Sequence, residues 1–569
     1  MGFLTKLCRM PKQISIENSR SDQNLPELPF ELTFDSVDSW LTRVPLKDSQ
    51  ESSRLVFSAL RRLNRYCIDP IRRIGILERF TPCVFGLSAE LEPLFVDATF
   101  PLDPGIRRIS RLGSQLHAQL AAGYLLVIDR RNSDDNKISE QEKVLALVRT
   151  LQSTYWYLIR TVQIYEAPST RFWKRLYTVL RYAEHCDLLY LKVPDRDRQT
   201  AYSIESLFKQ ITLLWLANPY RHPQHHIKQI VSLLDEFAEL VELRNHRPDS
   251  VAESTFFVDL TFDAPPRHIS HLTDRETDTC RFLYASPMIE GIMRFVKDPF
   301  SELRQIDPAP DRELVVRLVK TLAGTEKRKH RRKSENASVQ FIMGFGNIIE
   351  ALSQPEQKQD YGNPGSSQPL LDTPGYDLLP VDHERSTPFP QLRSRQQSPG
   401  NRVTAEQIWG NRADADLLSE PSYSIGRVRN SSVEGYQLMT PDDSSTNVKV
   451  GEMIAIEQDN QPLHLGAVRW LESSEGRGIQ FGIELLSRAV HFARATFGVN
   501  ALRKEHILFV DKTAGVNTPC SIVLSHAKYR SGTLVEMLIA GRPRYFRLQK
   551  LIELSPGFVR YTLSEPHVQ

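Results

Sequence analysis

The apolar residues between about 35 and 245 recur with the period of an α-helix. The sequence DSQE at 48–51 has the form of a capping box, and it precedes apolar residues spaced i, i+3, i+4 and i+7. SEQE at 139–142 begins a second run of this kind. The pattern therefore predicts a helical domain of antiparallel helix pairs over 35–324. Its expected helices include 71–96, 105–130, 169–189, 200–217, 224–243 and a last one from the N-cap Asp311 to Gly324.

Alternation of apolar and polar residues replaces the helical period after the basic run near 330. SVQFIMG at 338–344 predicts one strand, and short alternating runs at regular spacing resume beyond 420. Such spacing is typical of a small antiparallel barrel. Short strand-like runs of this kind continue from 505 to 565. This leaves two interpretations open: an extension of the first barrel or a second barrel. The strands expected beyond 420 are 425–430, 435–440, 451–457, 464–471 and 478–486, and a separate run at 254–262 predicts an isolated strand or hairpin.

Composition changes sharply between the two barrel stretches. Residues 351–419 are rich in Pro, Ser, Gln and Gly, and such a segment cannot bury enough apolar surface to offset its ordering entropy. We therefore expect a disordered insertion there, and a loose N-terminus over 1–34. The predicted fold class is multidomain α + β, with an all-helical N-terminal domain, an antiparallel barrel split by the insertion, and a C-terminal β region. The barrel segments are 325–350 and 420–490, and the C-terminal β region is 491–569.

The overall charge and the cysteines narrow the classes of function. The net charge is +3 for 569 residues, so an anion site must come from local clustering. The six cysteines form no C-x-x-C pair, which argues against a zinc knuckle and favours free thiols in the cytoplasm. No apolar stretch reaches the roughly 20 residues of a membrane span. No nucleophile-elbow, metalloprotease or P-loop motif occurs, so we expect no enzymatic activity and no cofactor.

Three histidines deserve a separate interpretation because they lie close together in HPQHH. His222, His225 and His226 could be metal ligands at a helix start, but no carboxylate or cysteine completes the set nearby in the sequence. We therefore expect a surface cluster at a helix N-terminus and no metal.

The basic run KRKHRRK at 327–333 is the first of two clusters with the chemistry of a nucleotide site. Arg328 and Arg332 have the spacing R-x-x-x-R, and Arg331 lies between them. Guanidinium is a planar, bidentate donor that suits phosphate and also the O6/N7 edge of guanine. Taken alone, such a run is equally typical of a solvated linker.

The stretch NSSVEG is the second cluster. It places Asn430, Ser432 and Gly435 at the spacing N-x-S-x-x-G. The amide and the hydroxyl can face the donor and acceptor edge of a base, and the glycine allows the backbone to approach closely. Taken alone, the stretch is typical of a turn between two strands.

Together the two clusters resemble the motif of the PilZ family, whose domains bind cyclic di-GMP. The family motif is R-x-x-x-R before the first barrel strand and D/N-x-S-x-x-G at a later turn, and here the halves are 328–332 and 430–435. GEMIAIEQ, LHLGAVRWLE and GRGIQFGIELLS are similar to the remaining PilZ strands. The departure is the distance of about 95 residues between the halves. Loop-closure entropy grows only logarithmically, by about 0.6 kcal/mol per doubling, so the insertion is compatible with the fold.

The resemblance implies a receptor for cyclic di-GMP, bound as one molecule or as a stacked pair. The layout is also similar to bacterial effectors tied to type IV pili and surface attachment, which implies a protein partner on the helical domain. Ordering of the arginine segment by the ligand would then fix the helical domain against the barrel. The site residues that the resemblance implies are Arg328, Arg331, Arg332, Asn430, Ser432 and Gly435.

Two other interpretations remain open. A degenerate PilZ domain would keep the barrel, bind no nucleotide and act only as a protein-interaction module. A nucleic-acid-binding protein would use the basic run at 327–333, but a clear aromatic platform is lacking, which argues against nucleic acid as the ligand. The aromatic residues of the barrel have the spacing of core or strand residues: Trp470, Tyr436 and Phe481.

Overall fold

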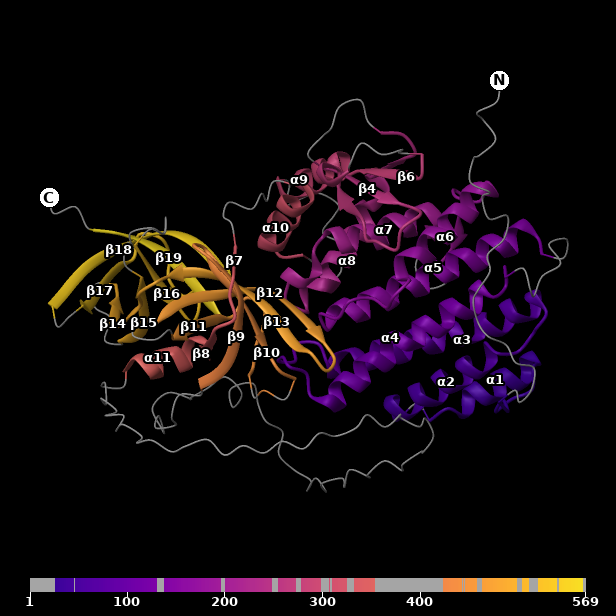
Figure 1. Ribbon diagram of the computed structural model, residues 1–569, viewed down its shortest axis with the longest axis horizontal. Coiled ribbons are helices and arrows are strands. Elements are labelled where there is room, and N and C mark those ends of the chain that lie inside the picture. The colour runs from indigo at the N-terminus through magenta and orange to yellow at the C-terminus, as the bar shows by residue number, and fades with distance from the viewer. Residues whose placement is uncertain are drawn as a thin grey trace, which may run out of the picture. The chain divides into compact units, whose positions relative to one another are not determined.

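The structure is a computed structural model, and Figure 1 shows its helices and strands in chain order. The residues that it describes are 26–45, 47–129, 138–195, 200–247, 254–272, 278–297, 306, 310–324, 332–353, 423–442, 444, 446–457, 463–498, 504–510, 520–539 and 542–565.

The N-terminal half is helical, as the apolar period predicts. Local signals begin the helices: Ser139 and Glu142 form a complete capping box at the start of α5, and Asp48 accepts hydrogen bonds from the backbone of Gln50 and Glu51 at the start of α2. The helices are α1 Phe34–Arg43, α2 Ser49–Leu63, α3 Pro70–Leu91, α4 Pro104–Leu125, α5 Glu140–Gln163, α6 Phe172–His185, α7 Ile204–Leu216, α8 His226–Phe237, α9 Ser286–Lys297 and α10 Arg312–Leu322.

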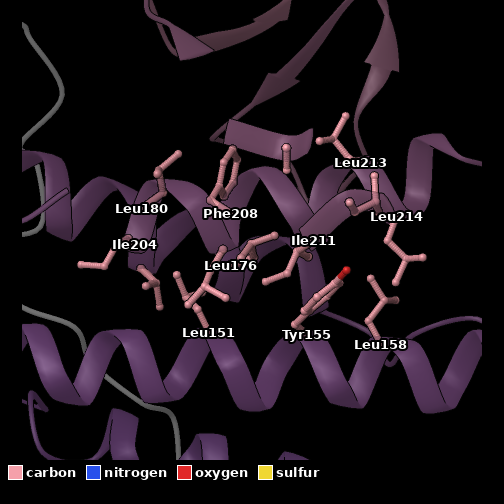
Figure 2. Close-up of a cluster of buried hydrophobic side chains, with 14 of the residues drawn as sticks. Leu151, Tyr155, Leu158, Leu176, Leu180, Ile204, Phe208, Ile211, Leu213 and Leu214 are labelled. Atoms are coloured by element: carbon pink, nitrogen blue, oxygen red, sulfur yellow. The ribbon is translucent and has the colours of Figure 1, made fainter. Parts of the chain in front are cut away.

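The helices enclose two hydrophobic cores. One core lies among α1 to α4, and the larger one is built around α5, α6, α7 and α8. Figure 2 shows part of the larger core, whose labelled side chains include Leu151 of α5, Leu176 of α6 and Phe208 of α7. Burial of such side chains stabilises a fold by about 1.5–3 kcal/mol each, so this packing, rather than helix propensity, holds the helices together.

Two predictions for the N-terminal half need correction. The segment before α1 is not loose throughout, because Phe30 is buried and its ring packs against Trp40 and Phe80, at centroid distances of 5.3 and 5.8 Å. The run at 254–262 is not an isolated strand or hairpin, since it belongs to a four-stranded antiparallel sheet. The order in that sheet is β3 (Glu242–Arg244), β6 (Cys280–Tyr284), β4 (Thr255–Asp259) and β5 (Arg267–His268), and a separate two-stranded pair joins β1 (Val193–Pro194) to β2 (Ala201–Tyr202).

The first barrel contains all the strands predicted on both sides of the insertion. Its hydrogen-bonded order is β10-β13-β12-β11-β8-β9, and pairing of β9 with β10 closes the ring. A short strand, β7, adds to β9 outside this ring. The strands are β7 Lys333–Ser334, β8 Ser338–Met343, β9 Tyr423–Ser432, β10 Gly435–Thr440, β11 Met453–Glu457, β12 His464–Ser474 and β13 Gly478–Ser487.

A helix that the sequence did not predict follows β8. This helix, α11, spans Phe345–Ser353 and buries Ile348 and Ile349. It takes in 351–353, the first three residues of the segment expected to be a disordered insertion, because the apolar run that starts the helix continues into them. The rest of 351–419 lies outside the described residues.

The C-terminal region is a second barrel, which resolves the alternative left open by the sequence. Its six strands close in the order β14-β15-β16-β19-β18-β17 around a hydrophobic core formed by its own residues. The strands are β14 His491–Phe497, β15 Glu505–Val510, β16 Ser521–Leu524, β17 Leu534–Ile539, β18 Arg542–Ser555 and β19 Phe558–Ser564.

The first barrel, by contrast, shares its core with the helical half. Phe95, Phe100 and Tyr165 belong to the same buried cluster as inward-facing barrel residues such as Phe341 and Phe481. Hydrogen bonds surround this shared core. The backbones of Phe100 and Val448 exchange two hydrogen bonds, and Arg107 of α4 donates two to Asp442, just after β10, at 3.0 and 2.9 Å. The helical half and the first barrel are therefore one packed unit.

Candidate functional site

The N-x-S-x-x-G stretch forms the hairpin between β9 and β10. Ser432 is the cross-strand partner of Gly435, and Asn430 is the partner of Gln437. The Ser432 hydroxyl donates to the backbone oxygen of Gly435 at 3.3 Å, and Val433 and Glu434 make the exposed tip between them. The motif residues thus lie at the end of a hairpin, half-buried and on the barrel surface.

Gly435 is required by a close approach of two backbones. A Cβ atom at this position would lie 1.9 Å from the backbone oxygen of Ile483 on β13. Its φ angle is not in the left-handed region, so the turn does not need a glycine for that reason. The close approach that Gly435 permits in the structure is thus to the backbone of β13.

The other half of the motif reaches the same hairpin through β7. Lys333 pairs with Ser431 and Ser334 pairs with Asn430, in antiparallel register. One further step of this register would set the exposed Arg332 opposite Ser432. Arg328 and Arg331 lie outside the described residues.

The chain bulges between β7 and β8, beside this junction. Three residues, 335–337, oppose two residues of β9, because Ser334 pairs with Asn430 while Ser338 pairs with Arg427. The bulge is fastened by Glu335, whose carboxylate accepts from the Ser431 hydroxyl at 2.6 Å and whose backbone N–H donates to the Arg429 carbonyl. A contact between residues 96 positions apart thus joins the segment that follows the arginine run to the hairpin.

A row of side-chain amides runs across the barrel from the motif. The side-chain N–H of Asn430 on β9 donates to the side-chain oxygen of Gln437 on β10. The side-chain N–H of Gln437 in turn donates to the side-chain oxygen of Gln480 on β13, at 3.2 Å. We call Asn430, Gln437 and Gln480 the amide row. Sequence reasoning missed Gln437 and Gln480, because alternation shows that both face away from the core but not that they meet across strands.

Trp470 lies at the far end of the same line of cross-strand partners. Gly482 pairs with both Gln437 and Trp470, so the three residues share the outer face of the sheet. The indole covers Gly482 so closely that a Cβ atom there would lie 1.8 Å from Nε1. Of the two alternatives for Trp470, core or strand residue, the structure shows a strand residue whose ring is half-buried on the outer surface. The sequence signal that could have revealed this contact is Gly482, two residues after Gln480, because a glycine inside a strand indicates a close approach.

The outer surface around the motif offers three complementary chemistries. Amide and hydroxyl groups provide donors and acceptors for the edge of a base. An indole face offers a surface on which a base can stack. Basic residues supply positive charge for phosphate, and the exposed ones on β7, just before β7 and on β9 are Lys333, Arg332, Arg427 and Arg429.

The histidines of HPQHH are engaged in structural contacts. The ring of His222 is buried against the Ala217 carbonyl at 3.1 Å, and His225 and His226 lie 3.2 and 3.4 Å from Asp97 and Asp311. Burial lowers the pKa of His222 to about 3 and that of His226 to about 4, so both rings are neutral at pH 7. Within the described ranges, no group of three His, Cys, Asp or Glu side chains could hold a metal ion. None of the described helices is long and apolar enough to cross a membrane.

Comparisons with known proteins match most of the chain. Residues 35–249 match the family model "Cyclic-di-GMP receptor FimW, N-terminal domain", and residues 377–491 match "Cyclic-di-GMP receptor FimW, middle PilZ domain". The cyclic-di-GMP receptor FimW of Pseudomonas aeruginosa PAO1 is 22% identical over 544 residues, which cover 89% of this chain and 86% of that protein. No solved structure matches the chain. The PilZ match begins after β8, so the structure adds β7 and β8 to the barrel that it covers.

Proposed function

The chain is a PilZ-domain protein of the FimW type, and from this premise we propose that it is a receptor for cyclic di-GMP. The observation that carries the proposal is the pairing of β7 with β9, which sets Arg332 beside the N-x-S-x-x-G hairpin. Two motif halves that are far apart in sequence are of use to one ligand only if the fold unites them. The register of β7 on β9 supports a shared site of this kind for Arg332, which lies within the described residues.

Each side chain would bind the part of the ligand that suits its chemistry. Arg332 would hold a phosphate or the O6/N7 edge of guanine, and Arg328 and Arg331 remain proposed ligand residues of the same segment. Asn430 and Ser432 would bond the edge of a base, with Gln437 and Gln480 fixing the Asn430 amide. Trp470 would stack on a base. Charge-assisted bonds to phosphate would supply most of the affinity.

The output would be a change in binding to a protein partner through the helical half, in control of type IV pili or surface attachment. The shared core alters how this signal would travel. Since Phe95 and Tyr165 already share a buried cluster with the core of the first barrel, the ligand would not need to dock the two parts. It would instead change the arginine segment that connects α10 to β7. We propose that the protein acts in the cytoplasm by binding and not by catalysis.

The test is calorimetric titration of the full chain with cyclic di-GMP. A charged hydrogen bond contributes about 1.5–3 kcal/mol, so Arg332→Ala should weaken binding by roughly 10- to 150-fold. Ser432→Ala should weaken it by roughly 5- to 10-fold, the effect of one neutral hydrogen bond of about 1 kcal/mol. Arg494→Ala, an exposed arginine on β14 of the second barrel, is the matched control and should bind like the parent.

Each outcome separates the alternatives. Loss of binding in both motif variants would place one ligand across both halves. Loss in Ser432→Ala alone would keep the hairpin site and remove Arg332 from it. A parent chain that does not bind cyclic di-GMP would contradict the proposal and leave a degenerate PilZ domain. Binding of single-stranded DNA with steep salt dependence, and indifference to cyclic di-GMP, would favour a nucleic-acid-binding protein.

A further inference from the structure

The amide row has a direction, because both of its hydrogen bonds run the same way across the sheet. The Asn430 side-chain N–H donates to Gln437 Oε1, and the Gln437 side-chain N–H donates to Gln480 Oε1 at 3.2 Å. An amide has one acceptor oxygen and one donor nitrogen, so a nitrogen turned toward Gln437 leaves the Asn430 oxygen for another partner. That Oδ1 atom has no hydrogen-bond partner among the described residues. The row therefore ends in an acceptor at the hairpin.

A β-bulge puts Asn430 in line with the row. Val428 pairs with Leu438 and Asn430 pairs with Gln437, so Arg429 is an extra residue on β9. Val428 is a buried core residue, and regular alternation would turn Asn430, two residues later, toward the core as well. The extra residue reverses this, and Asn430 lies half-buried beside Gln437 on the outer face. The bulge thus places the Asn430 amide on the surface proposed for the nucleotide.

Ser432 adds a second acceptor to the hairpin. A hydroxyl has one proton to donate, and that of Ser432 is engaged by the backbone oxygen of Gly435 at 3.3 Å. The lone pairs of the Ser432 oxygen are what remains for a ligand. Asn430 and Ser432 lie two residues apart on β9, and each of them presents an acceptor. Such a pair suits a ligand edge that carries two neighbouring donors.

Two neighbouring acceptors match one edge of guanine and not the corresponding edge of adenine. Guanine has donors side by side at N1–H and at its 2-amino group. Adenine has a lone pair at N1 and no polar group at position 2, and its amino group lies where guanine has O6. A site built around one hydrogen-bond pattern rejects a base that cannot complete it, because the polar groups of the site would be left unpaired.

We infer that Gln437 is a specificity-determining residue, which makes the site select guanine over adenine by holding the Asn430 acceptor toward the base. This role rests on the proposed receptor function and adds to it the residue that sets the choice of base. Gln437 is a positioning residue, since it acts through Asn430. A donor in place of Gln437 Oε1 would turn the Asn430 amide over and present its N–H groups to the base.

The test is calorimetric titration of the full chain with cyclic di-GMP and with cyclic di-AMP, and the readout is the ratio of the two dissociation constants. Both nucleotides carry the same two phosphates, so a change in charge or in the folded fraction alters both affinities alike and cancels in the ratio. Gln437→Lys places a donor beside Asn430 and should lower the preference for cyclic di-GMP roughly 10-fold. Gln437→Glu keeps an acceptor there, so both affinities should fall through repulsion of phosphate while the preference stays.

A double variant separates orientation from packing. In Asn430→Asp/Gln437→Lys the carboxylate presents an acceptor whichever way it turns, so the preference lost in Gln437→Lys should return. Gln549→Lys, at an exposed glutamine on β18 of the second barrel, is the matched control for the added charge. It should keep the preference of the parent.

The outcomes distinguish this role from the receptor function. A parent that binds cyclic di-GMP with no preference over cyclic di-AMP, or an unchanged preference in Gln437→Lys, would overturn the role of Gln437 and leave the receptor function standing. Equal loss of preference in Gln437→Lys and Gln437→Glu, or no recovery in the double variant, would also overturn it, because Gln437 would then act by packing alone. A parent that binds neither nucleotide would contradict this role and the receptor function together.

Discussion

The two barrels have the same number of strands in the ring but obtain their cores in different ways. The second barrel is built from contiguous chain and fills its interior with its own side chains. The first barrel draws β8 from across the insertion, and its core residues form one buried cluster with Phe95, Phe100 and Tyr165 of the helical half. The difference shows that the barrel carrying the motif cannot be treated as a separate module. A ligand on its surface acts on a unit that already includes the helices.

The largest expected effect separates the two cores directly. Phe95→Ala should destabilise the chain by about 3–5 kcal/mol, because it removes a fully buried ring and leaves a cavity in the shared core. Hydrogen exchange followed by mass spectrometry should show faster exchange in both the first barrel and the helices around it. Phe509→Ala, in the core of the second barrel, should accelerate exchange in that barrel alone. Faster exchange confined to the helices in Phe95→Ala would contradict the shared core.

One glycine from each barrel, Gly435 and Gly532, extends the comparison of the two barrels to the cost of adding a Cβ atom. Gly435→Ala should cost about 3 kcal/mol, at the upper end for overpacking, because its Cβ would meet the Ile483 backbone. Gly532 of the second barrel has φ of 94° and open space around it, so Gly532→Ala should cost only about 1 kcal/mol of backbone strain. Urea unfolding measures both values. A smaller cost at Gly435 than at Gly532 would show that β10 can move away from β13.

The junction between α4 and the first barrel should depend on pH. Hydrogen bonds from Arg107 lower the pKa of Asp442, and the backbone N–H of Gly476 contributes in the same direction. Because that pKa is lower in the folded state, the carboxylate adds stability above its unfolded value of about 3.9, and this stability is lost as the pH falls through the folded value.

Asp442→Asn should therefore cost about 2 kcal/mol at pH 7 and show a weaker loss of stability below about pH 4 than the parent. Thermal unfolding between pH 3 and pH 7 measures this difference. Asp38→Asn, in an exposed ion pair with Arg79, is the control and should change stability by less than about 1 kcal/mol. Parallel pH profiles for the parent and Asp442→Asn would mean that the junction is not held by this pair.

The smallest effect is expected where the two barrels meet. Arg469 of β12 is ion-paired with Glu484 of β13 and with Glu553 of β18, and these carboxylates raise its pKa. Glu553→Gln leaves the partner in the first barrel intact, so stability should fall by only about 1 kcal/mol. Exchange should rise in β18 and stay unchanged in β9 and β10. An increase in exchange in β9 and β10 as large as that in β18 would contradict this prediction. It would mean that the two barrels are coupled more tightly than their separate cores indicate.

The sequence predicted the local structure of the first barrel better than its surroundings. Alternation and the regular spacing of short apolar runs located β8 to β13, and the burial of β8, β9 and β10 shows a core face and an outer face. Of the four-stranded sheet around 242–284, only the strand at 254–262 was predicted, because β3 and β5 span three and two residues and are too short to show a periodic pattern. The shared core also could not be predicted, since the burial of Phe95 looks the same in sequence whichever part covers it.

The candidate site divides in the same way. Asn430, Ser432 and Gly435 were named as candidate site residues by resemblance to a family motif, because their spacing alone is typical of any turn between two strands. Gln437, Gln480 and Trp470 were missed as candidates, because their common surface depends on strand register and on a bulge at residue 469. Arg332 was found by resemblance to a family motif, and its place beside the hairpin depends on strand pairing across the insertion.

Separation of β8 from β9 also sets an order of events during synthesis of the chain. About 80 residues lie between the end of β8 and the start of β9. At roughly 5–20 residues per second, the ribosome needs roughly 4–16 s to cover that length. During this interval the helices have already been made. Their side chains that share a core with the first barrel can then be covered only by β8 and α11. The nascent chain thus waits with an open apolar surface, and a chaperone that holds it there would be most useful in that interval.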